Sequence, residues 1–237
     1  AGLDRLAGSG DLPLAPFTEG SRDSLVMPLS QPLEQYFALL AECGEPQAQQ
    51  EIHLQAGPLL IEDWLTDLRG SSADPRRLVL HTGRLKDRFD KVTREWALHL
   101  AACAAGHPLT THLQGQDGRL TLPPLGRDAA QEHLDHIGQA WHQALCEPLP
   151  IACATAFAWL KGEEKDNGEY EARKQFESGF MHTGEQEKEP ALARAWADFD
   201  ALLAPRHGDL SAFEYWTGQL YAPLYAHAQW HEPGEPA

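Results

Sequence analysis

The sequence has little positive charge, few cysteines and no long apolar segment. Its 19 lysines and arginines stand against 35 aspartates and glutamates, which gives a formal net charge of −16 at pH 7. Nucleic-acid binding draws much of its affinity from neutralised phosphates. This charge balance therefore argues against a protein that wraps DNA over most of its surface, and any direct DNA contact is expected to be local.

Several other classes of protein are also excluded. No apolar run approaches the roughly 20 residues that a membrane-spanning helix needs, and the start shows no signal peptide, so we expect no membrane contact and a cytoplasmic protein. The chain lacks an initiator methionine, and we expect it to be part of a longer protein. There is no Gly-rich phosphate loop, and we expect no metal and no cofactor. A zinc site is not expected because no CxxC spacing joins the four cysteines, Cys43, Cys103, Cys146 and Cys153.

The chain divides by composition into a short lead-in and one domain. Residues 1–30 are rich in Gly, Pro and Ser and predict an extended lead-in, whereas residues 31–237 are expected to form a single domain. Pro32 is placed to open a short helix that stops at Gly44. Strand-like patterns come first and helical patterns follow after Gly126, which predicts an α+β fold.

The strand patterns predict a β-meander followed by a hairpin. Ile52 and Leu54 alternate with polar residues, and two apolar runs follow at residues 59–65 and 78–80. A hairpin is predicted from residues 109–113 and 120–122, turning through residues 115–118.

The helical patterns are longer and more regular. One face of a helix is predicted where six apolar residues recur at spacings of 4, 3, 4, 4 and 3: Leu85, Phe89, Val92, Trp96, Leu100 and Cys103. Further helices are expected over residues 130–145, 154–160, 169–178, 190–203 and 210–227, with a kink or an end at Pro223.

Five short stretches, in this order along the chain, carry a resemblance to a known family. They are Gly10–Pro13, Gly83–Lys86 leading into Trp96 and Leu100, Leu149–Pro150 with Thr155–Leu160, Glu189–Trp196, and Leu220–Leu224. Together they resemble the C-terminal region of RecC, the gamma subunit of bacterial exodeoxyribonuclease V, the RecBCD complex.

The resemblance implies both a fold and a function. The fold would be that of the PD-(D/E)xK nucleases, with a core sheet flanked by helices and a helical C-terminal half. The function would be that of a non-catalytic scaffold in a helicase–nuclease of double-strand break repair and recombination. Its partners would be RecB-like and RecD-like subunits, and it would meet DNA through the assembled complex.

The residues themselves test whether a nuclease site survives. Such a site needs a carboxylate on one strand and an acid-x-Lys on the next, which together hold a hard cation and the attacking water. The first strand offers Glu62 and Asp63, but no acid occurs between Arg76 and Lys86. His81 and Gly83 stand where the second acid and the lysine would be expected. We therefore expect no catalytic residues and a degenerate site near these four positions.

Two alternatives remain open. The chain could be an active Mg²⁺-dependent nuclease with a migrated lysine, in which Lys86 reaches back to Glu62 or Asp63. It could also be a generic protein-interaction adaptor with no link to DNA.

Two further groups are candidates for contacts. Arg84, Arg88 and Lys91 would share one face of the predicted helix and are candidates for DNA contact, although intrahelical pairing with the interleaved acids explains the pattern equally well. A second group lies on the last predicted helix, which carries more aromatic residues than one buried stripe needs. Its members Tyr215, Tyr221 and Tyr225 are candidates for a partner interface, and core packing is the alternative.

Overall fold

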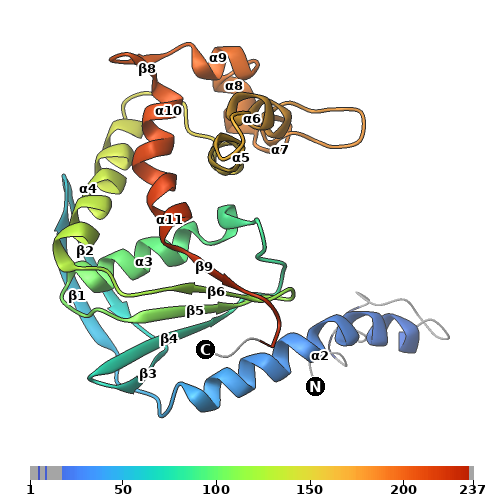
Figure 1. The fold of residues 1–237 in the computed structure, drawn as a ribbon, viewed down its shortest axis with the longest axis vertical. Coiled ribbons are helices and arrows are strands. Elements are labelled where there is room, and N and C mark those ends of the chain that lie inside the picture. Colours follow the sequence, from blue (N-terminus) through green and yellow to red (C-terminus); the bar gives the residue numbers. More distant parts are fainter. Residues whose placement is uncertain (1–4, 6–8, 10–17, 235–237) are drawn as a thin grey trace.

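The computed structural model of the chain describes residues 5, 9 and 18–234, and over this part the chain is α+β. A five-stranded sheet forms the centre, with helix α3 on one face and helix α2 on the other (Figure 1). The remaining helices gather at one end of the sheet. The α+β class predicted from the sequence is confirmed, whereas the more specific PD-(D/E)xK topology stays a prediction.

The central sheet has the strand order β3-β4-β5-β6-β9, and two separate hairpins, β1-β2 and β7-β8, accompany it. Strands β4 and β5 are parallel neighbours, and the other pairs in the central sheet are antiparallel. The strands are β1 (Gln50–Ala56), β2 (Leu59–Leu65), β3 (Leu68–Ser71), β4 (Asp74–Leu80), β5 (Thr110–Gln114), β6 (Arg119–Leu122), β7 (Arg206–His207), β8 (Leu210–Ser211) and β9 (Gln229–His231).

The helices before residue 145 cover the sheet and the β1-β2 hairpin, and the later ones build the C-terminal half. The helical elements are α2 (Thr18–Glu42), η1 (Phe89–Lys91), α3 (Thr93–Ala104), α4 (Arg127–Ala144), α5 (Cys153–Glu163), α6 (Gly168–Phe176), α7 (Glu185–Lys188), α8 (Pro190–Ala195), α9 (Phe199–Leu203), α10 (Ala212–Trp216), η2 (Thr217–Tyr221) and α11 (Ala222–His227).

The expected meander is split into two sheets. Apolar residues 59–65 and 78–80 were predicted to lie on neighbouring strands, and this is wrong, because β2 pairs with β1 and β4 pairs with β3 and β5. Asp67 takes a left-handed backbone conformation, with φ of 61°, and interrupts the extended conformation of the chain after β2. The short strand β3 then takes the place beside β4, with Leu68 opposite Arg77.

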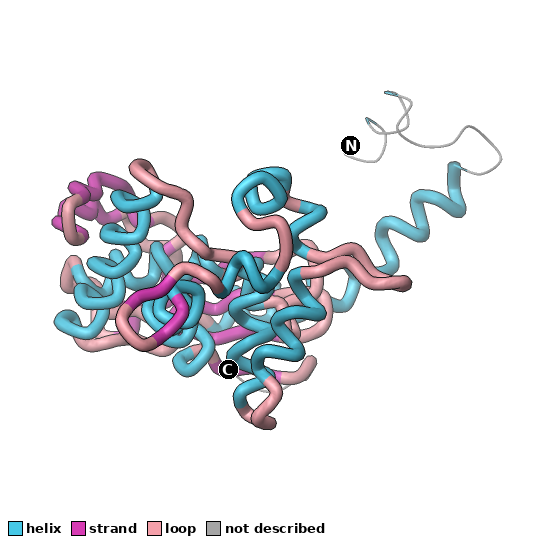
Figure 2. Tube along the Cα trace, turned by 90° about the horizontal axis from the view of Figure 1, so that it is seen from above, coloured by secondary structure: helices cyan, strands magenta, loops and turns pink. Residues whose placement is uncertain are grey.

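The predicted lead-in is also corrected where the structure describes it. Residues 18–30 are helical rather than extended, and α2 begins at Thr18 instead of at Pro32. Its serines do not break the helix, because Ser24 turns its hydroxyl back to the carbonyl of Gly20. The C-terminal part of α2 packs on the sheet through Leu39, and the N-terminal part extends away from the body (Figure 2). The rest of the lead-in lies outside the described residues, and the domain boundary at residue 31 stays a prediction.

The long helix predicted from Leu85 is shorter than expected. Residues 85–88 form a turn, η1 follows, and α3 begins only at Thr93. The six apolar residues of the predicted face nevertheless pack into the same core, with Leu85 buried beside Val92 and Trp96. The apolar pattern therefore predicted burial correctly, while the local chain path is set by contacts with the β5-β6 turn. The predicted β5-β6 hairpin itself is confirmed.

The C-terminal half is mostly helical, as predicted. Residues 210–211, predicted to begin the last helix, instead form strand β8, and two further departures follow. The segment 190–203 is split into α8 and α9, because Asp198 caps a new helix by accepting a hydrogen bond from the Ala201 backbone N–H at 2.7 Å. Helices α10 and α11 run on through the π-helical turn η2, and Pro223 lies at the start of α11. The second departure is strand β9, which was not foreseen. It carries Trp230 back to the edge of the central sheet.

Candidate functional site

The two carboxylates expected as the first metal ligand lie on the β1-β2 hairpin. Glu62 and Asp63 are both exposed on β2, and Glu62 faces His53 of β1, with 3.2 Å between Oε1 and Nδ1. Adjacent residues of a strand point to opposite faces, so these two carboxylates cannot turn to one cation together. His81 and Gly83 follow β4 of the central sheet instead. The structure therefore does not place the four expected positions on neighbouring strands.

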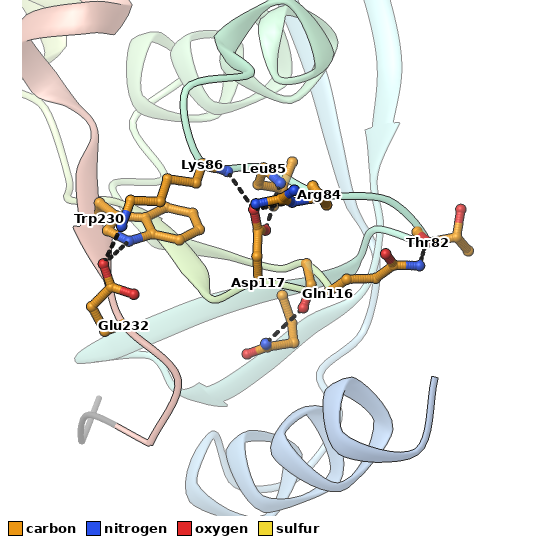
Figure 3. A network of polar contacts seen from close by, with 10 residues as sticks. Thr82, Arg84, Leu85, Lys86, Gln116, Asp117, Trp230 and Glu232 are labelled. Carbon is orange, nitrogen blue, oxygen red and sulfur yellow. Dashed lines mark hydrogen bonds and ion pairs between the residues drawn. The ribbon is translucent and has the colours of Figure 1, made fainter. Parts of the chain in front are cut away.

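The end of β4 is held by the β5-β6 turn. The backbone N–H of His81 donates to the carbonyl of Gln114 at 2.8 Å, and the backbone N–H of Gln116 donates to the carbonyl of Gly83 at 3.0 Å. The Gln116 side chain adds a 2.7 Å hydrogen bond to the carbonyl of Thr82 (Figure 3). The segment that would supply catalytic groups in a nuclease is thus fixed through its backbone.

The acid in this region is Asp117, at the tip of the β5-β6 turn. It accepts hydrogen bonds from the backbone N–H groups of Leu85 at 2.8 Å and Lys86 at 3.3 Å. It also accepts one from the guanidinium Nε of Arg84 at 3.2 Å (Figure 3). Burial alone would raise the pKa of Asp117, but these hydrogen bonds outweigh it and hold the pKa below its usual range. The carboxylate serves to anchor the loop.

Strand β9 closes the same region from the C-terminal side. The Lys86 ammonium lies 2.5 Å from Glu232, and the Trp230 indole N–H donates to the same carboxylate at 3.2 Å (Figure 3). Gly118 permits this approach. Its φ is +147°, and an added Cβ would lie 2.5 Å from the Trp230 ring. Lys86 is therefore held toward β9, where its ammonium pairs with Glu232 rather than with Glu62 or Asp63.

The three candidate DNA contacts do not share a helix face, because the chain from residue 85 to 92 is not an α-helix. Arg84 pairs with Asp117, while Arg88 and Lys91 both pair with Asp90, at 3.0 and 3.2 Å. Burial would raise the pKa of Asp90, but the two cations hold it below its usual value. All three cations are exposed and each has an acidic partner. A DNA contact at these residues stays a prediction.

The three candidate interface tyrosines differ in their surroundings. Tyr221 packs edge-on against Phe157, with ring centroids 5.3 Å apart, and Tyr225 packs likewise against Phe89 at 5.2 Å. Tyr215 instead stacks on His207 at 3.6 Å, at the far end of the helical half. The first two thus take part in the packing of the domain core, the alternative considered for them. A partner contact at any of the three stays a prediction.

Three of the residues that build this region, Asp117, Trp230 and Glu232, were not singled out from the sequence. Asp117 lay in a predicted turn, where Asp is common for local reasons, and Trp230 and Glu232 lay beyond the last predicted helix. No local signal joins Asp117 and Glu232 to Leu85 and Lys86, since these partners lie far away in the chain. Within residues 18–234, no three or more His, Cys, Asp or Glu side chains are grouped so that they could hold a metal ion. Over the same range, no helix is both long and apolar enough to span a membrane.

Comparison with known proteins identifies the family to which the chain belongs. No curated protein matches the chain. A family model described as the RecC C-terminal domain, however, matches residues 1–164. The match includes the stretches at residues 83–100 and 149–160 that carried the resemblance, and the stretches at residues 189–196 and 220–224 lie beyond it. Because the matched range covers well over half of the 237 residues, the chain belongs to the RecC C-terminal domain family.

Proposed function

We propose that this chain is a non-catalytic, nuclease-like scaffold domain of an exodeoxyribonuclease V helicase–nuclease. Membership of the RecC C-terminal domain family implies a component of the RecBCD complex in DNA repair. Within that complex, the domain holds RecB-like and RecD-like subunits and helps to guide the separated strands. It acts in the cytoplasm and meets DNA as part of the assembly, in keeping with its net charge of −16.

The observation that supports a scaffold role most directly is the use of Asp117. A PD-(D/E)xK site needs acids from two adjacent strands that converge on one cation. Here His81 and Gly83 follow β4, and Glu62 and Asp63 lie on a hairpin outside the central sheet. The acid beside the end of β4, Asp117, directs its oxygens to the backbone of residues 85 and 86. These residues do not fit a catalytic metal.

A cleavage assay tests the absence of catalysis. The purified chain is incubated with linear duplex and single-stranded DNA in Mg²⁺ or Mn²⁺, and we expect no cutting above the buffer control. Cutting that disappears on Asp63→Ala and on Lys86→Ala would favour the alternative of a nuclease with a migrated lysine. The variant Glu51→Ala, on the neighbouring strand β1, is the matched control.

A co-purification assay tests the partners. The full-length subunit that contains this domain is expressed with RecB-like and RecD-like subunits, and we expect a stable ternary complex. Deletion of the domain is expected to abolish retention of at least one partner. Full retention of both partners after the deletion would contradict the scaffold proposal. Recovery of neither partner by the intact subunit would favour the generic adaptor.

A further inference from the structure

The loop between α6 and α7 presents two large apolar side chains to solvent. Phe180 has an exposed fraction of 104 % and Met181 of 91 %, so neither side chain packs on the rest of the described chain. The loop extends away from the helices of the C-terminal half in both overall views (Figures 1 and 2). We call this pair the apolar tip. Exposing an aromatic and a methionine side chain next to each other to water is unfavourable in free energy, and covering them with another apolar surface would remove this cost.

The apolar tip lies on a turn that is held by backbone and side-chain hydrogen bonds. Gly179 and His182 form an isolated antiparallel bridge, with a 3.0 Å hydrogen bond from the Gly179 N–H to the His182 carbonyl. The His182 imidazole donates through Nε2 to the carbonyl of Lys174 in α6 at 2.6 Å. An added Cβ on Gly179 would lie 2.6 Å from the His182 ring, so glycine is needed for this close packing.

The base of the loop is fastened to α7 in the same way. The Ser178 hydroxyl donates to the Glu187 carboxylate at 2.5 Å and accepts from the Gly184 N–H at 2.9 Å. Gly184 lies so close to α6 that an added Cβ would stand 2.3 Å from the Phe176 carbonyl. Glu185, next in sequence, is buried and accepts hydrogen bonds at the start of α5. Both ends of the turn are therefore joined to the helical core.

We infer that the apolar tip is a docking anchor that inserts into an apolar pocket of a partner protein subunit. The inference rests on the proposed function in that the partner is a subunit of the same complex. Because the turn is already ordered, insertion costs little conformational entropy, and buried aromatic anchors carry most of the free energy at protein interfaces. The loop lies beyond the residues that match the family, so family membership does not assign this contact.

The charge around the tip favours a protein over a nucleic acid. The segment from Glu177 to Glu189 carries four glutamates and one lysine, a formal charge of −3. An apolar wedge that enters DNA needs flanking cations to hold the phosphates, and this segment would repel them. The complementary pocket on the partner has an apolar floor for Phe180 and Met181 and a basic rim that faces the exposed Glu187 and Glu189.

The test compares two pairs of exposed apolar residues in the full-length subunit. Phe180→Ala with Met181→Ala removes the apolar tip. As the control, Trp141→Ala with Leu145→Ala removes an exposed aromatic and an exposed aliphatic side chain, 53 % and 66 % exposed, on and just after α4. Co-purification and titration with RecB-like and RecD-like subunits should show affinity for one partner at least tenfold weaker in the tip variant. The α4 control and the thermal midpoints of both variants should match the parent protein.

The outcomes separate the two proposals. If the tip variant assembles with the partner subunits as well as the parent protein does, the docking anchor is overturned and the scaffold role stands. If the parent protein itself does not assemble with them, both proposals are overturned. A photo-crosslinking residue at position 180 supplies a second measurement. Crosslinks in the assembled, DNA-bound complex should form with one partner subunit, and crosslinks to DNA instead would overturn the inference.

Discussion

The Asp117 carboxylate accepts a 2.8 Å hydrogen bond from the backbone N–H of Leu85, a residue 32 positions earlier in the chain. Leu85 is 1 % exposed and packs with Val92 in the core. One acid in a hairpin turn thus fixes both the loop after β4 and the entry to α3.

The variant Asp117→Ala is expected to destabilise the protein by about 1–3 kcal/mol, because it leaves the buried Leu85 N–H without an acceptor. Urea unfolding at pH 7 measures the loss. Glu51→Ala, an exposed acid on β1, should change the free energy of unfolding by less than about 0.5 kcal/mol. An equal effect of both variants would show that Asp117 has no anchoring role.

Acid should destabilise the protein through buried histidines. His99 donates from Nε2 to the Pro123 carbonyl at 2.9 Å and contacts the Thr111 hydroxyl through Nδ1, and burial lowers its pKa to about 4. The unfolded chain binds a proton near pH 6.5, so the folded state is most stable above that pH and loses stability as the pH falls toward 4. For His99 alone the loss is on the order of 3 kcal/mol over that interval.

The test is the difference in unfolding free energy between pH 7 and pH 5. His99→Gln keeps a donor for Pro123 but cannot titrate, so its difference should be smaller than that of the parent protein by roughly 2 kcal/mol. His53→Gln, at an exposed site on β1, should keep most of the parental difference. A parental difference retained by His99→Gln would place the acid sensitivity elsewhere, for example at His112, whose pKa is also lowered to about 4 by burial.

A buried ion pair joins β4 to α3. The Arg77 guanidinium lies 2.5 Å from the Glu95 carboxylate, and the two side chains are 8 % and 14 % exposed. Removing one partner leaves an uncompensated buried charge, so Arg77→Met or Glu95→Leu should each cost about 3–5 kcal/mol. The double variant Arg77→Met with Glu95→Leu should recover much of that loss, as a double-mutant cycle would measure. Additive losses would contradict direct coupling between the two charges.

A glycine sets how closely α4 packs on β1. An added Cβ at Gly138 would lie 2.2 Å from the backbone carbonyl of Ala56, so Gly138→Ala should destabilise by about 1–3 kcal/mol or more. Gly218→Ala is the matched control. Apart from its chain neighbours and the backbone of its own helix, no atom lies within 4 Å of an added Cβ there, and the substitution should be neutral or slightly stabilising. Thermal unfolding of the two variants compares them, and similar midpoints would contradict the close approach.

The sequence by itself determined the α+β class, the family and most of the buried residues. Apolar periodicity needs only local geometry, and it predicted the burial of Leu85, Leu100 and Cys103 and the hairpin of β5 and β6. The same periodicity failed on α4, where Trp141 and Leu145 continue the apolar spacing of Ala130, Leu134 and Ile137 yet are exposed.

Only the tertiary structure decided which strands are neighbours and where the polar groups are used. The places of β2 outside the central sheet and of β9 within it depend on pairings between distant segments, which no local pattern encodes. Asp117 and Leu85, or Lys86 and Glu232, likewise meet only after the sheet forms. Hydrophobic burial follows local periodicity, whereas hydrogen-bond partners depend on the final positions of both groups, and for this reason the site could not be read from its residues alone.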